Sequence, residues 1–111
     1  MGIKTITIAT TASVNDDALS GDSLARKPFG RRISSLGLAG SAQPGDYGVK
    51  ITVEGVEAGE YYNLAAGANT MPDRETTYGV NIPVPANFLV EALVLAAPTT
   101  NAGKMILETK P

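Results

Sequence analysis

The feature that most constrains the fold is a strict alternation of apolar and polar residues over residues 47–54. Apolar side chains recur at every second position, namely Tyr47, Val49, Ile51 and Val53. Successive side chains of an extended strand point to opposite faces, so a period of two predicts a strand with one buried face. The segment follows Gln43-Pro44-Gly45-Asp46, a turn sequence that separates it from the preceding chain.

Further strand candidates follow one another at short intervals. Thr5–Ile8 alternates in the same way, and Tyr78–Ile82 leads into Pro83 and Pro85, which favour the edge of a sheet. Residues 33–38, with Gly37 as a candidate break, and residues 104–109 are further strands, whereas residues 10–23 have the composition of a polar loop. The turn-forming residues 57–60 lead into residues 61–65, so we expect a hairpin over residues 47–65 with its turn at 57–60.

Composition agrees with this pattern. Twelve Gly, seven Pro and eleven Thr in 111 residues, with no Trp, are typical of short extended segments separated by turns. We therefore predict an all-β fold in a single domain over residues 1–111. Seven to eight short strands at this spacing predict one β-sandwich, with a jelly-roll-like arrangement.

The apolar run from Phe88 to Ala97 admits two interpretations, a strand and a short Asn-capped helix, and we favour the strand. A strand would place Leu89, Leu93 and Leu95 on one face beside Glu91, while the opposite face is also apolar. A two-layer sandwich buries one face of each sheet. We therefore expect the Leu89, Leu93 and Leu95 face to be covered by another subunit.

The absence of His and Cys narrows the possible chemistry. It removes the imidazole base, the thiolate nucleophile, disulfides and the usual nitrogen and sulfur ligands of transition metals. Asp16, Asp17 and Asp22 could supply oxygen ligands for calcium, but their spacing is not that of an EF-hand loop. We predict no enzymatic activity, no cofactor, no metal site and no small-molecule substrate. The N-terminus is not of signal-peptide type and no apolar run predicts membrane insertion.

Four of the nine basic residues lie within seven positions, Arg26, Lys27, Arg31 and Arg32, with Phe29 between them. Such a cluster can contact an acidic partner or neutralise phosphates, and Phe29 can stack on a base or fill a partner's pocket. A solvated loop is the alternative interpretation. The net charge of -2 argues against a dedicated nucleic-acid binder. We take these five residues as the candidate contact with a partner or with nucleic acid.

Aromatic residues suggest one more kind of site. Tyr61 and Tyr62 are adjacent, so in an extended chain one of them faces away from the core and could stack on a sugar ring. Tyr47 is in phase with Val49 and Ile51, which favours burial.

Beyond single motifs, the chain resembles the small all-β capsid, penton and capsid-decoration proteins of bacteriophages and related viruses. The resemblance rests on the absence of Cys and His, on the abundance of Thr, Gly and Ala, and on residues 6–11, 47–53, 84–89 and 97–104 (Ile-Thr-Ile-Ala-Thr-Thr, Tyr-Gly-Val-Lys-Ile-Thr-Val, Val-Pro-Ala-Asn-Phe-Leu and Ala-Pro-Thr-Thr-Asn-Ala-Gly-Lys). It implies a virion structural protein, assembled in the host cytoplasm, that packs against copies of itself or a major capsid protein. The alternatives are a carbohydrate- or ligand-binding sandwich module of adhesin type and a small nucleic-acid-binding barrel.

Overall fold

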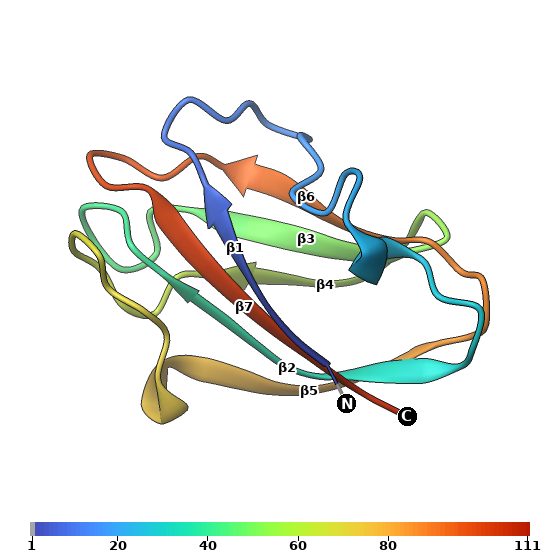
Figure 1. The fold of residues 1–111 in the computed structure, drawn as a ribbon. Coiled ribbons are helices and arrows are strands. Elements are labelled where there is room, and N and C mark those ends of the chain that lie inside the picture. The colour runs from blue at the N-terminus through green and yellow to red at the C-terminus, as the bar shows by residue number, and fades with distance from the viewer. Residues whose placement is uncertain (1) are drawn as a thin grey trace.

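The computed structural model describes residues 2–111, which form seven strands and two short 3-10 helices. Antiparallel pairing arranges the strands in a four-stranded sheet of order β1-β7-β2-β5 and a three-stranded sheet of order β4-β3-β6 (Figure 1). The all-β prediction is therefore confirmed. The elements are β1 (Gly2–Ile8), η1 (Ser23–Ala25), β2 (Arg31–Ala39), β3 (Gly48–Val53), β4 (Val56–Tyr62), η2 (Arg74–Thr76), β5 (Thr77–Val84), β6 (Val90–Ala96) and β7 (Gly103–Lys110).

One hydrophobic core takes side chains from both sheets. Alternate residues of each inner strand enter it, for example Met105 and Leu107 of β7 and Val49 and Ile51 of β3, all fully buried. The predicted apolar faces of β1 and β3 thus face the core, although Thr52, predicted to face outward, is also buried, at 4% exposed. Beside the strands, Leu24 and Ala25 of η1 are also buried, and Leu19 enters the core from the long connection between β1 and β2.

The predicted hairpin exists, but its turn is not at residues 57–60. The chain reverses at Glu54 and Gly55, both with positive φ (51° and 78°), between the paired residues Val53 and Val56. Two left-handed residues form the type I′ turn that suits a two-residue hairpin. Residues 57–60 instead belong to β4, where a register shift accommodates the extra residue.

Residues 90–96 form a strand, so the helical interpretation of the run from Phe88 to Ala97 is wrong. On its outer edge β6 is extended by the segment 15–18. The amide of Asn15 donates to Val94 O (2.7 Å), the amide of Val94 donates to Asp16 O (2.9 Å), and the amide of Ala18 donates to Ala92 O (2.8 Å). Part of the region predicted as a loop therefore pairs with the three-stranded sheet.

Two further predictions concern the four-stranded sheet. Gly37 does not interrupt β2, which runs unbroken to Ala39. A Cβ at position 37 would lie 2.5 Å from Cβ of Pro72, so the glycine allows the 67–73 connection to pack against the strand. Pro83 lies in β5, which is an edge strand of the four-stranded sheet, as predicted. Proline has no N–H to donate, and at the edge of a sheet no neighbouring strand needs that hydrogen bond.

A candidate interaction surface where three loops meet

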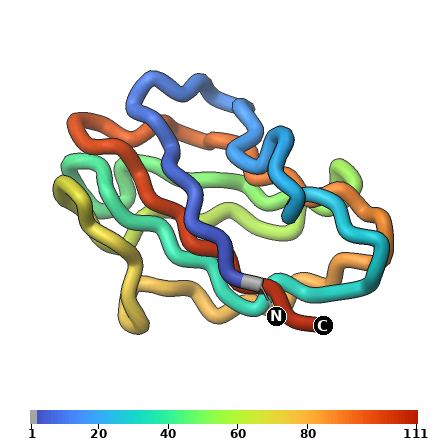
Figure 2. The backbone as a smooth tube through the Cα atoms, viewed as in Figure 1, coloured from blue at the N-terminus to red at the C-terminus, as the bar shows by residue number. Residues whose placement is uncertain are grey.

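Three connections from distant parts of the sequence meet at one end of the two sheets (Figure 2). They are the chain that leads from η1 into β2 (26–30), the β3–β4 turn (54–55) and the β5–β6 loop (85–89). We call this region, together with Val56 at the start of β4, the three-loop end.

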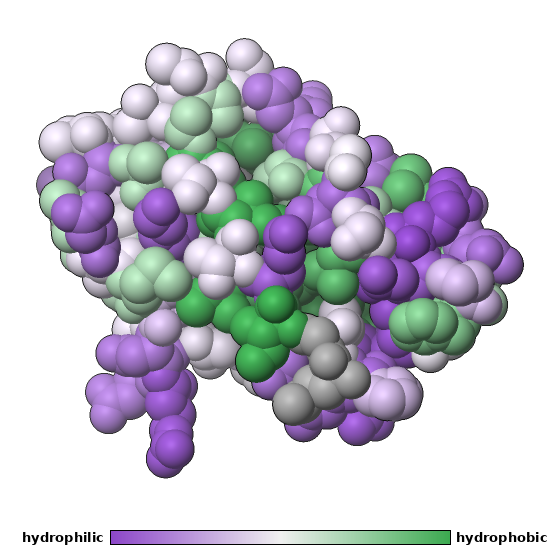
Figure 3. Space-filling model, in the orientation of Figure 1, coloured by the Kyte–Doolittle hydropathy of each residue, from purple (hydrophilic) through white to green (hydrophobic). Residues whose placement is uncertain are grey.

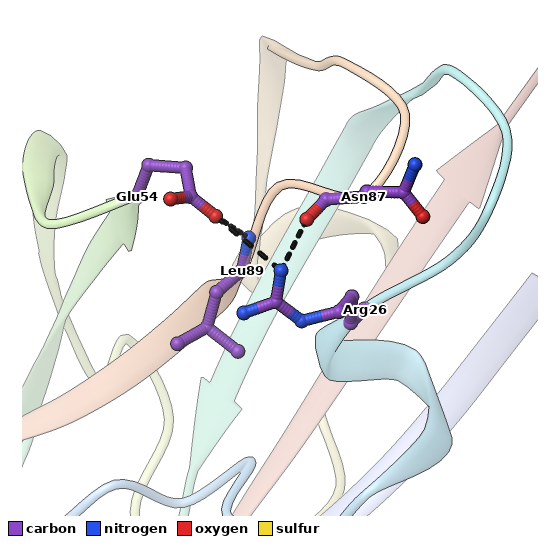
Figure 4. Close-up of polar contacts among 4 residues, drawn as sticks. All are labelled: Arg26, Glu54, Asn87 and Leu89. Atoms are coloured by element: carbon purple, nitrogen blue, oxygen red, sulfur yellow. Dashed lines mark hydrogen bonds and ion pairs between the residues drawn. The ribbon is translucent and has the colours of Figure 1, made fainter.

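Polar contacts hold the three-loop end together (Figure 4). Glu54 and Leu89 exchange two hydrogen bonds: the amide of Glu54 donates to Leu89 O (2.8 Å) and the amide of Leu89 donates to Glu54 Oε1 (2.6 Å). Arg26 Nη1 donates to the backbone carbonyl of Asn87 and lies 3.7 Å from Glu54 Oε1. The amide of Asn87 in turn donates to Lys27 O (2.7 Å). Each loop is therefore bonded to another, which holds the backbones of the three loops beside one another.

Each of the three loops presents a large hydrophobic side chain to the outside. Phe29 is 55% exposed, Val56 70% and Phe88 40%. Hydrophilic side chains gather around a few hydrophobic ones at the right-hand end of the molecule in Figure 3. Aromatic groups surrounded by charged ones are typical of protein contact surfaces, where the apolar group supplies most of the binding energy.

The predicted basic cluster is only partly at this surface. Arg26 and Phe29 are exposed and Lys27 is half-buried, whereas Arg31 and Arg32 lie in β2 and not in a loop. Because successive residues of a strand face opposite sides, Arg32 is exposed and Arg31 is 7% exposed. The five residues therefore do not lie together in one exposed loop, and their contact with a partner stays a prediction.

The three leucines predicted as one face are separated in a similar way. Leu93 and Leu95 are half-buried on the face of β6 opposite Val90 and Val94. Leu89 precedes the strand and packs against the hydrophobic core, because its two bonds to Glu54 turn it away from the outer face. A single face of three leucines does not form, and the outward apolar pair is Leu93 and Leu95.

The carboxylates considered for calcium have backbone partners. Asp16 accepts from the amide of Ser13 (2.9 Å), Asp17 Oδ1 accepts from the amides of Leu19 (2.9 Å) and Ala92 (3.1 Å), and Asp22 accepts from the amide of Leu24 (2.8 Å). The Leu24 amide, more than any other contact, lowers the pKa of Asp22. Among residues 2–111 no group of three or more acidic residues is placed to hold a metal ion.

The adjacent tyrosines of β4 face opposite sides, as the extended backbone requires. Tyr61 is half-buried, with its ring 5.2 Å from that of Tyr78, and burial raises its pKa. Tyr62 is 41% exposed and is the outward-facing ring of the pair. Tyr47 is fully buried, as its phase with Val49 predicts.

Sequence reasoning missed the parts of the three-loop end that come from the β3–β4 turn and from the β5–β6 loop, which joins the two sheets. Val56 and Phe88 lie 32 positions apart in the sequence and neither belongs to a charged cluster. Gly55 between two valines was a partial signal, since Gly suits the positive φ of the second turn residue, but Glu54 gave no local signal for the first.

Within residues 2–111 there is no helix long and apolar enough to cross a membrane. Comparison of the chain with protein-family models, with curated proteins and with solved structures gives no match in any of the three.

Proposed function

We propose that the chain is a virion structural protein, a jelly-roll-like β-sandwich subunit of a viral shell that acts by packing against copies of itself or against a major capsid protein. A minor capsid, penton or decoration subunit fits this description. The proposal assigns no catalysis to the chain and requires no cofactor.

The observation that carries the proposal is the order of the strands. If the segment 15–18 is counted as a rudimentary strand between β1 and β2, residues 2–111 contain eight extended segments, which we number 1 to 8 along the chain, so that β1 is 1, the segment is 2 and β2 to β7 are 3 to 8. The four-stranded sheet then has the order 1-8-3-6, and the other sheet, with this segment outside β6, has the order 2-7-4-5. A jelly roll has this strand order when its eight strands are numbered along the chain, and viral capsid proteins use that architecture widely, which supports the proposal.

A second support is the three-loop end. A shell subunit needs a surface with apolar groups for its neighbours, and the Glu54–Leu89 and Arg26–Asn87 bonds hold side by side the three connections that carry or adjoin Phe29, Val56 and Phe88. Burying aromatic and aliphatic groups of this size is worth roughly 1.5–3 kcal/mol each before the cost of association.

Size-exclusion chromatography with light scattering, over a series of protein concentrations, tests the proposal. We expect oligomers or shells, visible also by electron microscopy, that the double variant Phe29→Ser and Phe88→Ser weakens. The matched control is Leu64→Ser with Met71→Ser, which removes two exposed apolar groups from the connection between β4 and β5. In Figure 1 this connection lies at the end of the sheets opposite the three-loop end. A monomer at every concentration that also binds no capsid shell would overturn the proposal.

A further inference from the structure

The most unusual polar group in the molecule is the guanidinium of Arg31. Arg31 begins β2 and faces the core side of the four-stranded sheet, where 7% of the residue is exposed. Its Nε and Nη2 atoms are buried, and no acceptor in residues 2–111 lies within hydrogen-bonding distance of either.

An unpaired buried guanidinium is costly. Arginine stays protonated in proteins, so it cannot escape the cost by losing its charge, although burial lowers the pKa of Arg31 from its ordinary value. The buried Nε–H and Nη2–H groups lose their hydration and gain no hydrogen bond in return. An acceptor supplied from outside the chain would recover this loss.

The two unpaired atoms specify the shape of that acceptor. In the planar guanidinium, Nε–H and Nη2–H lie on the same side and run nearly parallel, at the spacing of the two oxygens of one carboxylate. One neutral hydroxyl group would satisfy a single donor. A carboxylate would satisfy both and would also neutralise the charge.

The surroundings of Arg31 form a pocket of about 220 Å³ with a basic and partly apolar lining. Its lining residues are Leu24, Lys27, Phe29, Arg31, Thr109, Lys110 and Pro111. Lys27 and Lys110 add positive charge, and Lys110 lies 4.0 Å from Glu108 Oε1. The loop residues 28–30 beside the pocket are exposed, and an exposed loop moves aside more easily than a strand to admit a group to the buried nitrogens.

We propose that the Arg31 pocket binds a carboxylate group, with Nε–H and Nη2–H each donating to one of its oxygens. The proposal deepens the proposed function and rests on it for the source of the carboxylate, which is an acidic side chain of a neighbouring subunit that enters beside Phe29. The binding chemistry itself does not depend on that source, because a free carboxylic acid presents the same two oxygens.

A carboxylate fits this pocket better than a phosphate of nucleic acid does. A phosphodiester also presents two anionic oxygens, but its two ester oxygens each carry a sugar, and these bulky polar groups would have to lie against Leu24 and Phe29. A nucleic-acid backbone also needs a continuous basic track. Here the alternation of β2 turns Arg32 to the other face of the sheet, away from Arg31.

Nuclear magnetic resonance of the Arg31 Nε–H group tests the proposal on the wild-type chain. Acetate, phosphate and chloride are titrated at equal ionic strength, and a short peptide with blocked termini, whose one charged group is a Glu side chain, is titrated separately. We expect the Arg31 signal to shift and saturate with acetate at a lower concentration than with phosphate, and to saturate earliest with the peptide. No shift with either carboxylate, or tighter binding of phosphate, would overturn the proposal. Equal affinity for acetate and for the peptide would contradict the inference that the carboxylate belongs to an acidic side chain of a neighbouring subunit.

Thermal melts of Arg31→Met and Arg32→Met provide the matched comparison, because the two variants remove the same charge from opposite faces. With acetate at tenfold its dissociation constant, we expect the wild type and Arg32→Met to gain about 4–8 °C and Arg31→Met to gain nothing. In chloride, Arg31→Met should melt no lower than the wild type, because it removes an unpaired buried charge. A rise in melting temperature with acetate that persists in Arg31→Met would show that acetate binds at another site.

The two proposals fail separately. A wild-type chain that binds acetate at Arg31 but stays monomeric and binds no shell would contradict the proposed function alone. A chain that assembles but gives no response at the Arg31 signal would contradict the carboxylate site alone.

Discussion

The ring of Tyr47 lies against the backbone of Gly103: a Cβ at position 103 would be 2.6 Å from Cζ of Tyr47. Tyr47 precedes β3 of the three-stranded sheet and Gly103 begins β7 of the four-stranded sheet, so the contact joins the two sheets at one end of the core. The Tyr47 hydroxyl also donates to the backbone carbonyl of Ala39, the last residue of β2. One side chain thus ties one sheet to two strands of the other.

We expect Gly103→Ala to lower the free energy of unfolding by about 1–3 kcal/mol, because the added methyl overlaps a ring that is packed on all sides. Denaturant unfolding measures the effect. The control is Gly79→Ala in β5, where a Cβ meets nothing within 4 Å and the expected change is within about 0.5 kcal/mol. Equal effects of the two substitutions would contradict the Tyr47–Gly103 contact.

Tyr47 also predicts a dependence of stability on alkaline pH. Burial raises the pKa of Tyr47 well above its ordinary value of 10.0, so the folded chain keeps the proton that the unfolded chain loses. Stability that is fully present below pH 10 is therefore lost as the pH rises further, at about 1.4 kcal/mol per pH unit for one proton. In Tyr47→Phe we expect the free energy of unfolding to fall less steeply above pH 10 than in the wild type. At pH 7 we expect it to be about 1 kcal/mol lower, because the hydrogen bond of the hydroxyl is missing.

Unfolding curves at pH 7, 10 and 11 measure both effects. Tyr62→Phe, which changes an exposed ring, is the control for the general effect of removing a tyrosine. A loss of stability above pH 10 that is as steep in Tyr47→Phe as in the wild type would assign the dependence to other groups.

Asp17→Ala should destabilise the chain more than Asp16→Ala. Asp17 Oδ1 accepts from the amides of Leu19 and Ala92, and both of these residues are buried, so its removal leaves two donors without a partner. We expect a loss of about 2–3 kcal/mol. Asp16 is exposed and accepts one hydrogen bond, from the amide of Ser13. We therefore expect Asp16→Ala to lower the free energy of unfolding by less than about 1 kcal/mol. Chemical denaturation of both variants measures the difference, and equal losses would contradict these roles.

Leu93→Lys should reduce self-association while it lowers the free energy of unfolding by less than about 1 kcal/mol. Leu93 is half-buried on the outward face of β6, opposite Lys50 of β3 in the register, so a lysine there extends into solvent and adds a like charge. Light scattering coupled to size exclusion, with thermal melts, measures both quantities. The control is Leu64→Lys, which changes an exposed leucine in the connection between β4 and β5. A monomeric wild type that Leu93→Lys simply unfolds would mean that Leu93 is a core residue.

The sequence by itself determined the fold class and most of the strands. The alternations at Thr5–Ile8 and Tyr47–Val53 are local, since a period of two specifies which face is buried without reference to any partner strand. The same logic predicted the burial of Tyr47 and the outward position of one of Tyr61 and Tyr62. Pro83 likewise indicated an edge strand, because a proline lacks the N–H that a central strand must donate.

Only the tertiary structure decided the features that depend on a distant partner. The hairpin turn is at Glu54 because that residue exchanges two bonds with Leu89, 35 positions later, which hold it at positive φ. Asn63 is buried because its side chain donates to the carbonyls of Gly40, Gln43 and Ala65 and accepts from the amide of Tyr47, partners that only the folded chain brings together.

The basic cluster illustrates both parts of this division. Its charge is a property of the sequence, but the register in which β2 pairs with β5, Arg31 opposite Val84, decides that Arg31 enters the protein and Arg32 faces outward. A shift of one residue in the pairing register exchanges the two faces of a strand, so the face that a charged residue takes is decided by its neighbours in space and not by its neighbours in sequence.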